Sequence, residues 1–427
     1  MSNVKCFNLK QGINLYYIPE KKFKTNYISI NIHNELKTET AAKCALLCSV
    51  LGRGTKKFPT ENAISSHLQN LYGASFKADI RRKGIDQILS LSASCVNDEF
   101  LPENETVFND VLQFLFDVLL EPKVCNDSFD EEYVSQEKLN LINDIEAAIN
   151  DKRSYSVWRL TQNMFSGKPY AVYELGDVDK VNDITPENLY EFYCNMLSLC
   201  PIDIFVVGNI DVSMVCSYVE ERLKDITPKN HKYPTCELYN ENFDGKEIVE
   251  RFDVTQSKLC IGYKTSISPD SDDYFKLMVA NGILGGGAHS KLFNEVREKL
   301  SLAYYAGSSL ARYNGTLIIS AGIESNNKQK ALDEIFTQVN LLKSGSFTDI
   351  EFEAAVKNIT SSILVLGDSI GYLCDYYLSN AVTNTMISPE EFVSKIESVT
   401  REDVKKIAEK LQLQMIYFLT GKESEEK

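Results

Sequence analysis

The chain has 427 residues, a formal net charge of −15 and eleven cysteines. This length predicts two or more domains, and the acidic balance argues against nucleic acid or an anionic membrane surface as the main partner. No stretch approaches the ~18 consecutive apolar residues of a transmembrane helix, and the start of the chain has no apolar signal segment. The cysteines are odd in number and show no paired framework, so we expect reduced thiols and a cytoplasmic protein.

Strand and helix patterns alternate through the first half of the chain. Period-2 alternation over 13–18 and 27–32 predicts two strands of an antiparallel meander. The further elements expected in this half are a helix over about 38–51, a helix from the Thr60 cap to about Leu71, strands near 74–82 and 86–95, helices over about 104–120 and 128–166, a helix that begins at Thr185-Pro186, a buried strand over 202–208 and a helix near 212–225.

The second half repeats the first. Residues 184–189 resemble 399–404, and residues 205–208 resemble 418–421. Two further pairs match in the same order, namely 50–54 with 283–287 and 71–84 with 302–315. The repeats predict a duplicated α+β unit of normal domain size. We expect domains at 1–225 and 246–427, joined by a polar linker at 226–245 that contains Pro228, Pro234 and Gly245.

One stretch, Leu284–Tyr304, carries the clearest motif. Three glycines end a helical pattern, and a second helix follows with Leu292, Phe293 and Val296 on one buried face. Arg297 lies beside that face, and Tyr304 stands where a strand begins.

This stretch resembles the insulinase/pitrilysin-like zinc metallopeptidases, a group that includes the mitochondrial processing peptidase and bacterial relatives. Their usual form is close to L-G-G-G-x-x-S-R-L-F-x-x-V-R-E-x-x-G-L-A-Y, and this chain departs from it at Lys291 and Ser301. The resemblance implies two homologous domains, each an antiparallel sheet packed by helices. It also implies that Arg297 and Tyr304 bind substrate near the scissile bond. Without it, the pair would be a solvated Arg and a packed Tyr at a helix–strand corner.

The resemblance also shows what the chain lacks. Active members carry His-x-x-Glu-His on a first-half helix, so that two imidazoles on one helix face reach one zinc ion. Here Ala45, Cys48 and Ser49 occupy those three positions, in a register set by the Gly-Thr that follows. Glu137 is present on the helix that carries the distant carboxylate ligand, but the ligand position itself falls on Asp144. We therefore expect no metal in this chain.

The other histidines do not restore a metal site. His33, His67, His231 and His289 have no His or Cys neighbour at helical spacing, so we expect surface or capping roles for them. Cys44, Cys48 and Asp144 form an alternative set of metal ligands, although buried cysteines are usually small hydrophobic residues.

These features favour a catalytically inactive subunit of a two-component peptidase. It would supply Arg297 and Tyr304 to a zinc-bearing paralogous partner, or pair with itself, and take unfolded peptides. One alternative is a purely structural subunit, which has no use for that pair of side chains. Another is a self-sufficient metalloenzyme that uses Cys44, Cys48 and Asp144. Among bacterial relatives the chain resembles zinc-less paralogues associated with 5-aminopentanol modification of elongation factor P, although no single residue carries that narrower association.

Overall fold

The computed structural model describes residues 4–102, 105–234, 238 and 246–422. The chain divides into two compact units, and each is assembled from separate segments. Unit 1 comprises Met1–Glu146, Val172–Thr235 and Ser369–Val382; unit 2 comprises Ala147–Ala171, Cys236–Asp368 and Thr383–Lys427. The domains expected from the sequence, 1–225 and 246–427, are contiguous. They therefore do not show that Ala147–Ala171 belongs to unit 2 and that Ser369–Val382 belongs to unit 1. Most of the expected linker, at 235–237 and 239–245, lies outside the described residues.

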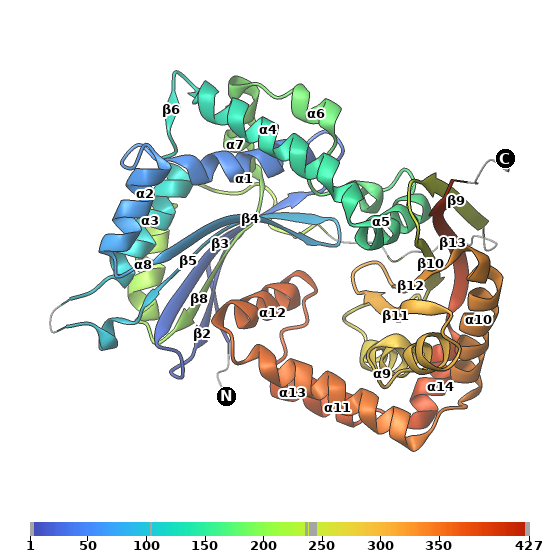
Figure 1. The fold of residues 1–427 in the computed structure, drawn as a ribbon. Coiled ribbons are helices and arrows are strands. Elements are labelled where there is room, and N and C mark those ends of the chain that lie inside the picture. Colours follow the sequence, from blue (N-terminus) through green and yellow to red (C-terminus); the bar gives the residue numbers. More distant parts are fainter. Residues whose placement is uncertain (1–3, 103–104, 235–237, 239–245, 423–427) are drawn as a thin grey trace. The chain divides into compact units, whose positions relative to one another are not determined.

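The large sheet of unit 1 has six strands in the order β1-β2-β8-β3-β5-β4 (Figure 1). They are β1 (Lys5–Lys10), β2 (Ile13–Pro19), β3 (Thr25–Glu35), β4 (Ser75–Lys83), β5 (Asp86–Val96) and β8 (Ile202–Gly208). β2 and β8 run parallel, whereas the other neighbours are antiparallel. The expected meander was wrong at one point, because β8 separates β2 from β3. Every residue of β8 is buried, and a strand buried on both faces belongs in the middle of a sheet.

The hydrophobic core of unit 1 lies between one face of this sheet and a layer of helices. Ile28, Ile30 and Ile32 alternate along β3 and all point into that core. The helices of this unit are α1 (Ala41–Arg53), α2 (Glu61–Asn70), α3 (Phe108–Leu120), α4 (Glu131–Ala147), α6 (Val178–Asn182), α7 (Pro186–Leu199) and α8 (Val212–Arg222); a small hairpin is formed by β6 (Val124–Cys125) and β7 (Ser128–Phe129). The Thr60 and Thr185 hydroxyls cap α2 and α7, as predicted.

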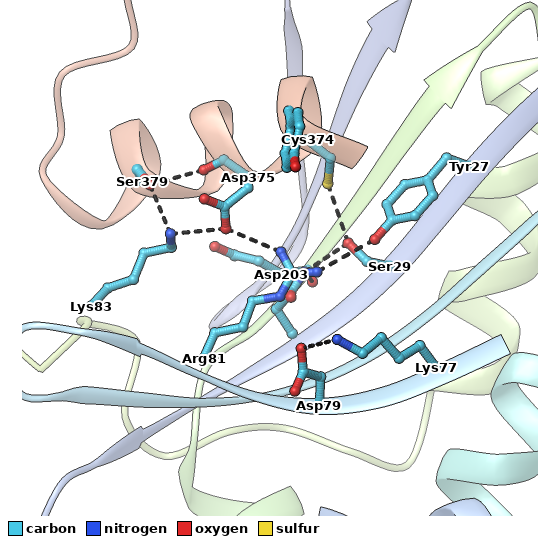
Figure 2. Close-up of polar contacts among 12 residues, drawn as sticks. Tyr27, Ser29, Lys77, Asp79, Arg81, Lys83, Asp203, Cys374, Asp375 and Ser379 are labelled. Atoms are coloured by element: carbon cyan, nitrogen blue, oxygen red, sulfur yellow. Dashed lines mark hydrogen bonds and ion pairs between the residues drawn. The ribbon is translucent and has the colours of Figure 1, made fainter. Parts of the chain in front are cut away.

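The opposite face of the same sheet is polar and is covered by α12 (Ile370–Val382), a helix that comes from the second half of the chain. Figure 2 shows how α12 is held: Asp375 Oδ1 accepts hydrogen bonds from Arg81 Nη1 at 3.1 Å and from Lys83 Nζ at 2.9 Å. Cys374 lies 3.5 Å from the Ser29 hydroxyl. Through these contacts α12 is joined to Ser29 of β3 and to Arg81 and Lys83 of β4 within unit 1.

Unit 2 contains a five-stranded sheet in the order β11-β12-β10-β13-β9. The strands are β9 (Lys246–Phe252), β10 (Ser257–Lys264), β11 (Ala303–Ala311), β12 (Thr316–Ile323) and β13 (Gln412–Gly421), and the helices are α5 (Lys152–Met164), α9 (Asp273–Gly285), α10 (Lys328–Ser344), α11 (Asp349–Leu366), α13 (Pro389–Glu397) and α14 (Arg401–Glu409). The helix expected over 128–166 was therefore wrong in its continuity, because it is divided between α4 and α5. α5 packs on β10 so closely that a Cβ at Gly262 would lie 2.4 Å from the Met164 sulfur.

The two sheets share one topology. The order β2-β8-β3-β5-β4 matches β9-β13-β10-β12-β11 strand for strand, and in both the first pair is parallel. This confirms the duplicated α+β organisation, with one parallel pair in each mainly antiparallel sheet. Within the described part of the chain, every helix is too short or too polar to cross a membrane.

Candidate functional site

The glycine-rich end of α9 is fitted against β11. A Cβ at Gly285 would lie 2.3 Å from the Ser308 backbone nitrogen, a distance that no real side chain tolerates. The Ser308 hydroxyl also donates to Asn281 Oδ1 at 2.7 Å. Glycine is therefore required where the motif begins, because the helix end and the strand approach each other directly.

The segment that follows is η4 (Leu292–Lys299), a π-helix rather than the α-helix expected from the sequence. Its last turn shows the wider spacing, since the Leu300 amide donates to the Glu295 carbonyl at 3.0 Å. Leu292 and Val296 are buried as predicted, but Phe293 is only partly buried. π-Helical turns are rare, and they are frequent at functional sites.

Arg297 projects from η4 toward solvent. Its side chain is 42% exposed, its guanidinium lies over the Phe293 ring at 4.6 Å, and its Nε is 3.5 Å from the Glu298 carboxylate. Phe293 is thus a platform beneath the guanidinium, which explains why this ring is not fully in the core.

Ser301 adopts a left-handed backbone conformation, with φ of +50°. This is the position where the resembling family usually has glycine. The turn that glycine would make is therefore retained, at a steric cost of roughly 1–2 kcal/mol for a residue with a Cβ.

Ser301→Gly is expected to raise the free energy of unfolding by up to ~1 kcal/mol, because relief of the left-handed strain exceeds the extra entropy of an unfolded glycine. Ser301→Ala is the control and should give no gain, since it keeps the Cβ. Urea unfolding of the three proteins measures the difference; equal or lower stability of the glycine variant would contradict the strain.

Tyr304 occupies a β-bulge at the start of β11. The pairing with β12 shifts from Ala303↔Ile323 to Tyr305↔Gly322, so Tyr304 is the extra residue. Its side chain is 59% exposed, and its hydroxyl donates to Glu324 Oε1 at 3.3 Å. Bulges often redirect a side chain beside a binding site. Arg297 and Tyr304 are both exposed to solvent, so a ligand can reach both side chains.

The positions of the missing zinc motif lie in unit 1. Ala45 and Cys48 are buried in the core on α1, whereas Ser49 on α1 and Asp144 on α4 are exposed. Burial raises the pKa of the Cys44 and Cys48 thiols, and protonated thiols are poor metal ligands. Among the described residues, no three His, Cys, Asp or Glu side chains are arranged to hold a metal ion. These residues do not fit zinc, and the geometry argues against the set Cys44, Cys48 and Asp144.

An ion pair connects α1 with α4 near these positions. Arg53 Nη1 lies 3.2 Å from the buried Glu137 carboxylate, and Arg53 Nη2 donates to Gln136 Oε1 at 2.6 Å. The sequence alone points to Glu137 but not to Arg53, its partner on α1. The contact holds the two helices together without a metal.

His33 is part of a buried ionic network, so its expected surface or capping role was wrong. Its Nδ1 lies 2.6 Å from Asp86 Oδ2 and its Nε2 lies 3.2 Å from Asp203 Oδ2, with all three side chains fully buried. Burial alone lowers the pKa of His33, but the two carboxylates outweigh it and raise the pKa to about 10. Tyr233 donates to Asp203 at 2.7 Å. At neutral pH His33 is therefore an imidazolium, held between the Asp86 and Asp203 side chains.

Comparison with known proteins places these features in a family. The Peptidase M16 inactive domain matches residues 183–359. The chain is 36% identical to the "probable inactive metalloprotease YmfF" of Bacillus subtilis over 418 residues, which cover 96% of both proteins. It is 23% identical over 373 residues to the "uncharacterized zinc protease YmxG" of the same species, with 84% of this chain and 88% of the relative covered.

Solved structures agree. A conserved protein from Enterococcus faecalis V583 superposes with a TM-score of 0.91 at 30% identity, with 99% of each chain covered. A peptidase M16 inactive domain from Pseudomonas fluorescens gives 0.81 at 18% identity, with 100% of each chain covered. The resemblance inferred from residues 284–304 is confirmed: this chain belongs to the M16 peptidase family, whose inactive domain it contains.

Proposed function

We propose that this chain is the zinc-less subunit of a two-component peptidase and supplies Arg297 and Tyr304 to a zinc-bearing paralogous partner. The observation that carries the proposal is a concentration of irregular backbone around this pair. A π-helix, a left-handed serine and a β-bulge follow one another between Leu292 and Tyr304. Each such feature costs free energy, and strain of this kind clusters at functional sites.

The two side chains suit peptide hydrolysis. Attack on a peptide carbonyl places negative charge on its oxygen, and fixed donors aimed at that oxygen stabilise the transition state. A guanidinium such as that of Arg297 presents only N–H donors, and the Tyr304 hydroxyl can also donate. Both are exposed on one unit of the chain, where an unfolded peptide can reach them.

A purely structural subunit is the second candidate, and one observation favours it. The Tyr304 hydroxyl already bonds Glu324, and the Arg297 guanidinium already rests on Phe293. These contacts would be enough if the pair only stabilised the helix–strand corner. The cytoplasmic location and the association with elongation factor P modification stay predictions, since no described contact bears on them.

Zinc analysis and co-purification test the proposal. The tag-free chain alone is expected to bind no zinc tightly and to cleave no peptide, because Ala45, Cys48 and Ser49 replace the zinc motif. Co-expression with a paralogue that carries His-x-x-Glu-His should give a complex, by size-exclusion chromatography with light scattering, and chelator-sensitive peptidase activity. A partner with Gln for the motif's Glu is the control and should assemble without activity. About one zinc per chain with matching activity, or a strict monomer that ignores the partner, would contradict the proposal.

A further inference from the structure

An open pocket of about 510 Å³ lies within unit 2, between the start of α5 and the turn that joins β9 to β10. The charged residues that line it are Asp151, Lys152, Arg153, Asp253 and Lys258. Neither the zinc positions nor the pair Arg297 and Tyr304 contribute to it.

Two cations converge on one aromatic ring beside this pocket. The Arg153 guanidinium lies 4.3 Å from the Tyr305 ring centroid, and the Lys258 ammonium lies 5.6 Å from it. Lys258 is 9% exposed. Burial first, and then the charge of Arg153, lower the pKa of Lys258. The two side chains therefore repel each other in the absence of a shared anion.

The protein's own groups neutralise this pair only in part, because the Asp151 carboxylate acts on both cations. Lys258 donates to the neutral amide of Gln256, and within the described ranges no carboxylate forms an ion pair with Arg153. Asp151 caps α5: its Oδ1 accepts from the backbone amides of Arg153 and Ser154, and its Oδ2 accepts from the Ser154 hydroxyl. Its single negative charge serves the helix start and offsets part of the charge of Arg153 and Lys258, which leaves an excess of positive charge at the pair.

The remaining charged residues of the pocket, Lys152 and Asp253, do not remove the excess of positive charge at Arg153 and Lys258. Lys152 Nζ donates to the Ile149 carbonyl at 2.6 Å. Asp253 is exposed and, among the described residues, pairs with no cation. An anion of one charge that bridges Arg153 and Lys258 would relieve their repulsion and gain charge-assisted hydrogen bonds.

We propose that this pocket binds the carboxylate of an acidic side chain in a peptide, with Arg153 and Lys258 as its partners. The ring of Tyr305 contacts both cations, and Tyr305 directly follows Tyr304 on β11, so we place the acidic side chain in the peptide segment beside Tyr304. The placement of the peptide at Tyr304 rests on the proposed function. The pocket adds to it a preference for a peptide with Glu or Asp near the bound segment.

Binding of a matched peptide pair to the isolated chain tests the site. The probes are two fluorescein-labelled nine-residue peptides of Ala, Ser and Leu with amidated C-termini, which differ only in a central Glu or Gln. The Glu peptide is expected to bind ~10-fold more tightly by fluorescence anisotropy, the effect of one or two charge-assisted contacts. Arg153→Gln and Lys258→Gln should each remove most of that preference. Lys330→Gln, an exposed lysine on α10, is the control and should keep it.

Two further arms identify the source of the carboxylate. A Gln peptide with a free C-terminal carboxylate should bind like its amide; equal affinity to the Glu peptide would overturn the assignment to an acidic side chain. A variant that ends at Lys422 should keep the preference for the Glu peptide, and loss of the preference in this variant would overturn the site. Equal binding of the Glu and Gln peptides to the wild-type chain overturns the site.

The exposed position of Arg153 makes Arg153→Gln the variant that should fold normally, and Arg153→Lys should restore part of the preference. Failure of this test leaves the proposed function intact, because that function is judged by Arg297 and Tyr304 in the assembled complex. A preference that survives in both pocket variants would also overturn the site.

Discussion

Arg297→Ala and Tyr304→Phe are each expected to lower the peptidase rate of the assembled complex by on the order of 10²–10³. Under the proposed function, each change removes one donor to the carbonyl oxygen of the peptide, and it leaves the buried residues of η4, Leu292 and Val296, untouched. Tyr304→Phe removes only a hydroxyl, which is the sharper of the two tests. Steady-state cleavage of a labelled peptide, after assembly and the partner's zinc content have been checked, measures the loss.

Lys299→Ala is the matched control, because Lys299 is an exposed cation on the same π-helix and pairs only with Glu295 among the described residues. It should cleave at the wild-type rate. Arg297→Lys keeps the charge but loses the guanidinium geometry, so an intermediate rate is expected. If the complexes with Arg297→Ala and Tyr304→Phe assemble and cleave at the wild-type rate, the two side chains are only structural. The second candidate, a purely structural subunit, is then favoured.

His33→Leu is expected to lower the free energy of unfolding by ~3–5 kcal/mol, because it leaves Asp86 and Asp203 buried without their shared cation. The triple variant His33→Leu, Asp86→Asn, Asp203→Asn should recover much of the loss, since it removes the uncompensated charges. His67→Gln is the control: His67 stacks on Phe58 outside the network. Thermal and urea unfolding measure all four proteins, and a loss below 1 kcal/mol for His33→Leu would contradict the ionic network.

The same network predicts a pH dependence. The pKa of His33 is raised to about 10 in the folded state, above its ordinary value of ~6.5. The stabilisation is therefore complete below pH ~6.5 and is lost as pH rises through 10; it is on the order of a few kcal/mol. The difference in stability between wild type and His33→Leu should shrink steadily from pH 6.5 to 9.5. A constant difference would show that His33 is neutral in the folded protein.

The sequence alone was sufficient to predict features that depend on residues close together in the chain. A Thr hydroxyl caps the helix that begins one residue later, so Thr60 and Thr185 could be identified from their neighbours. The motif from Leu284 to Tyr304 is likewise a continuous stretch, and it led to the family that the comparisons confirmed. The loss of the zinc motif at Ala45, Cys48 and Ser49 can be read directly from the amino-acid sequence.

Contacts between distant segments could not be found this way. His33 has no charged neighbour in the sequence that explains its burial; its partners come from β5 and β8, and only the sheet brings them together. Arg53 on α1 and Glu137 on α4 lie far apart in the sequence and meet only in the folded unit. The pocket at Arg153 and Lys258 also needs two elements far apart in the chain.

The tertiary structure also decided how the two halves are divided and how the motif is shaped. α12 completes unit 1 and α5 completes unit 2, although the periodicity of each helix shows only that one face is apolar, not which sheet will cover it. The π-helix at Arg297 and the bulge at Tyr304 also depend on tertiary packing. Residue spacing predicts a helix and a strand, but the register at their junction is set by the packing of η4 and β11 against the rest of unit 2.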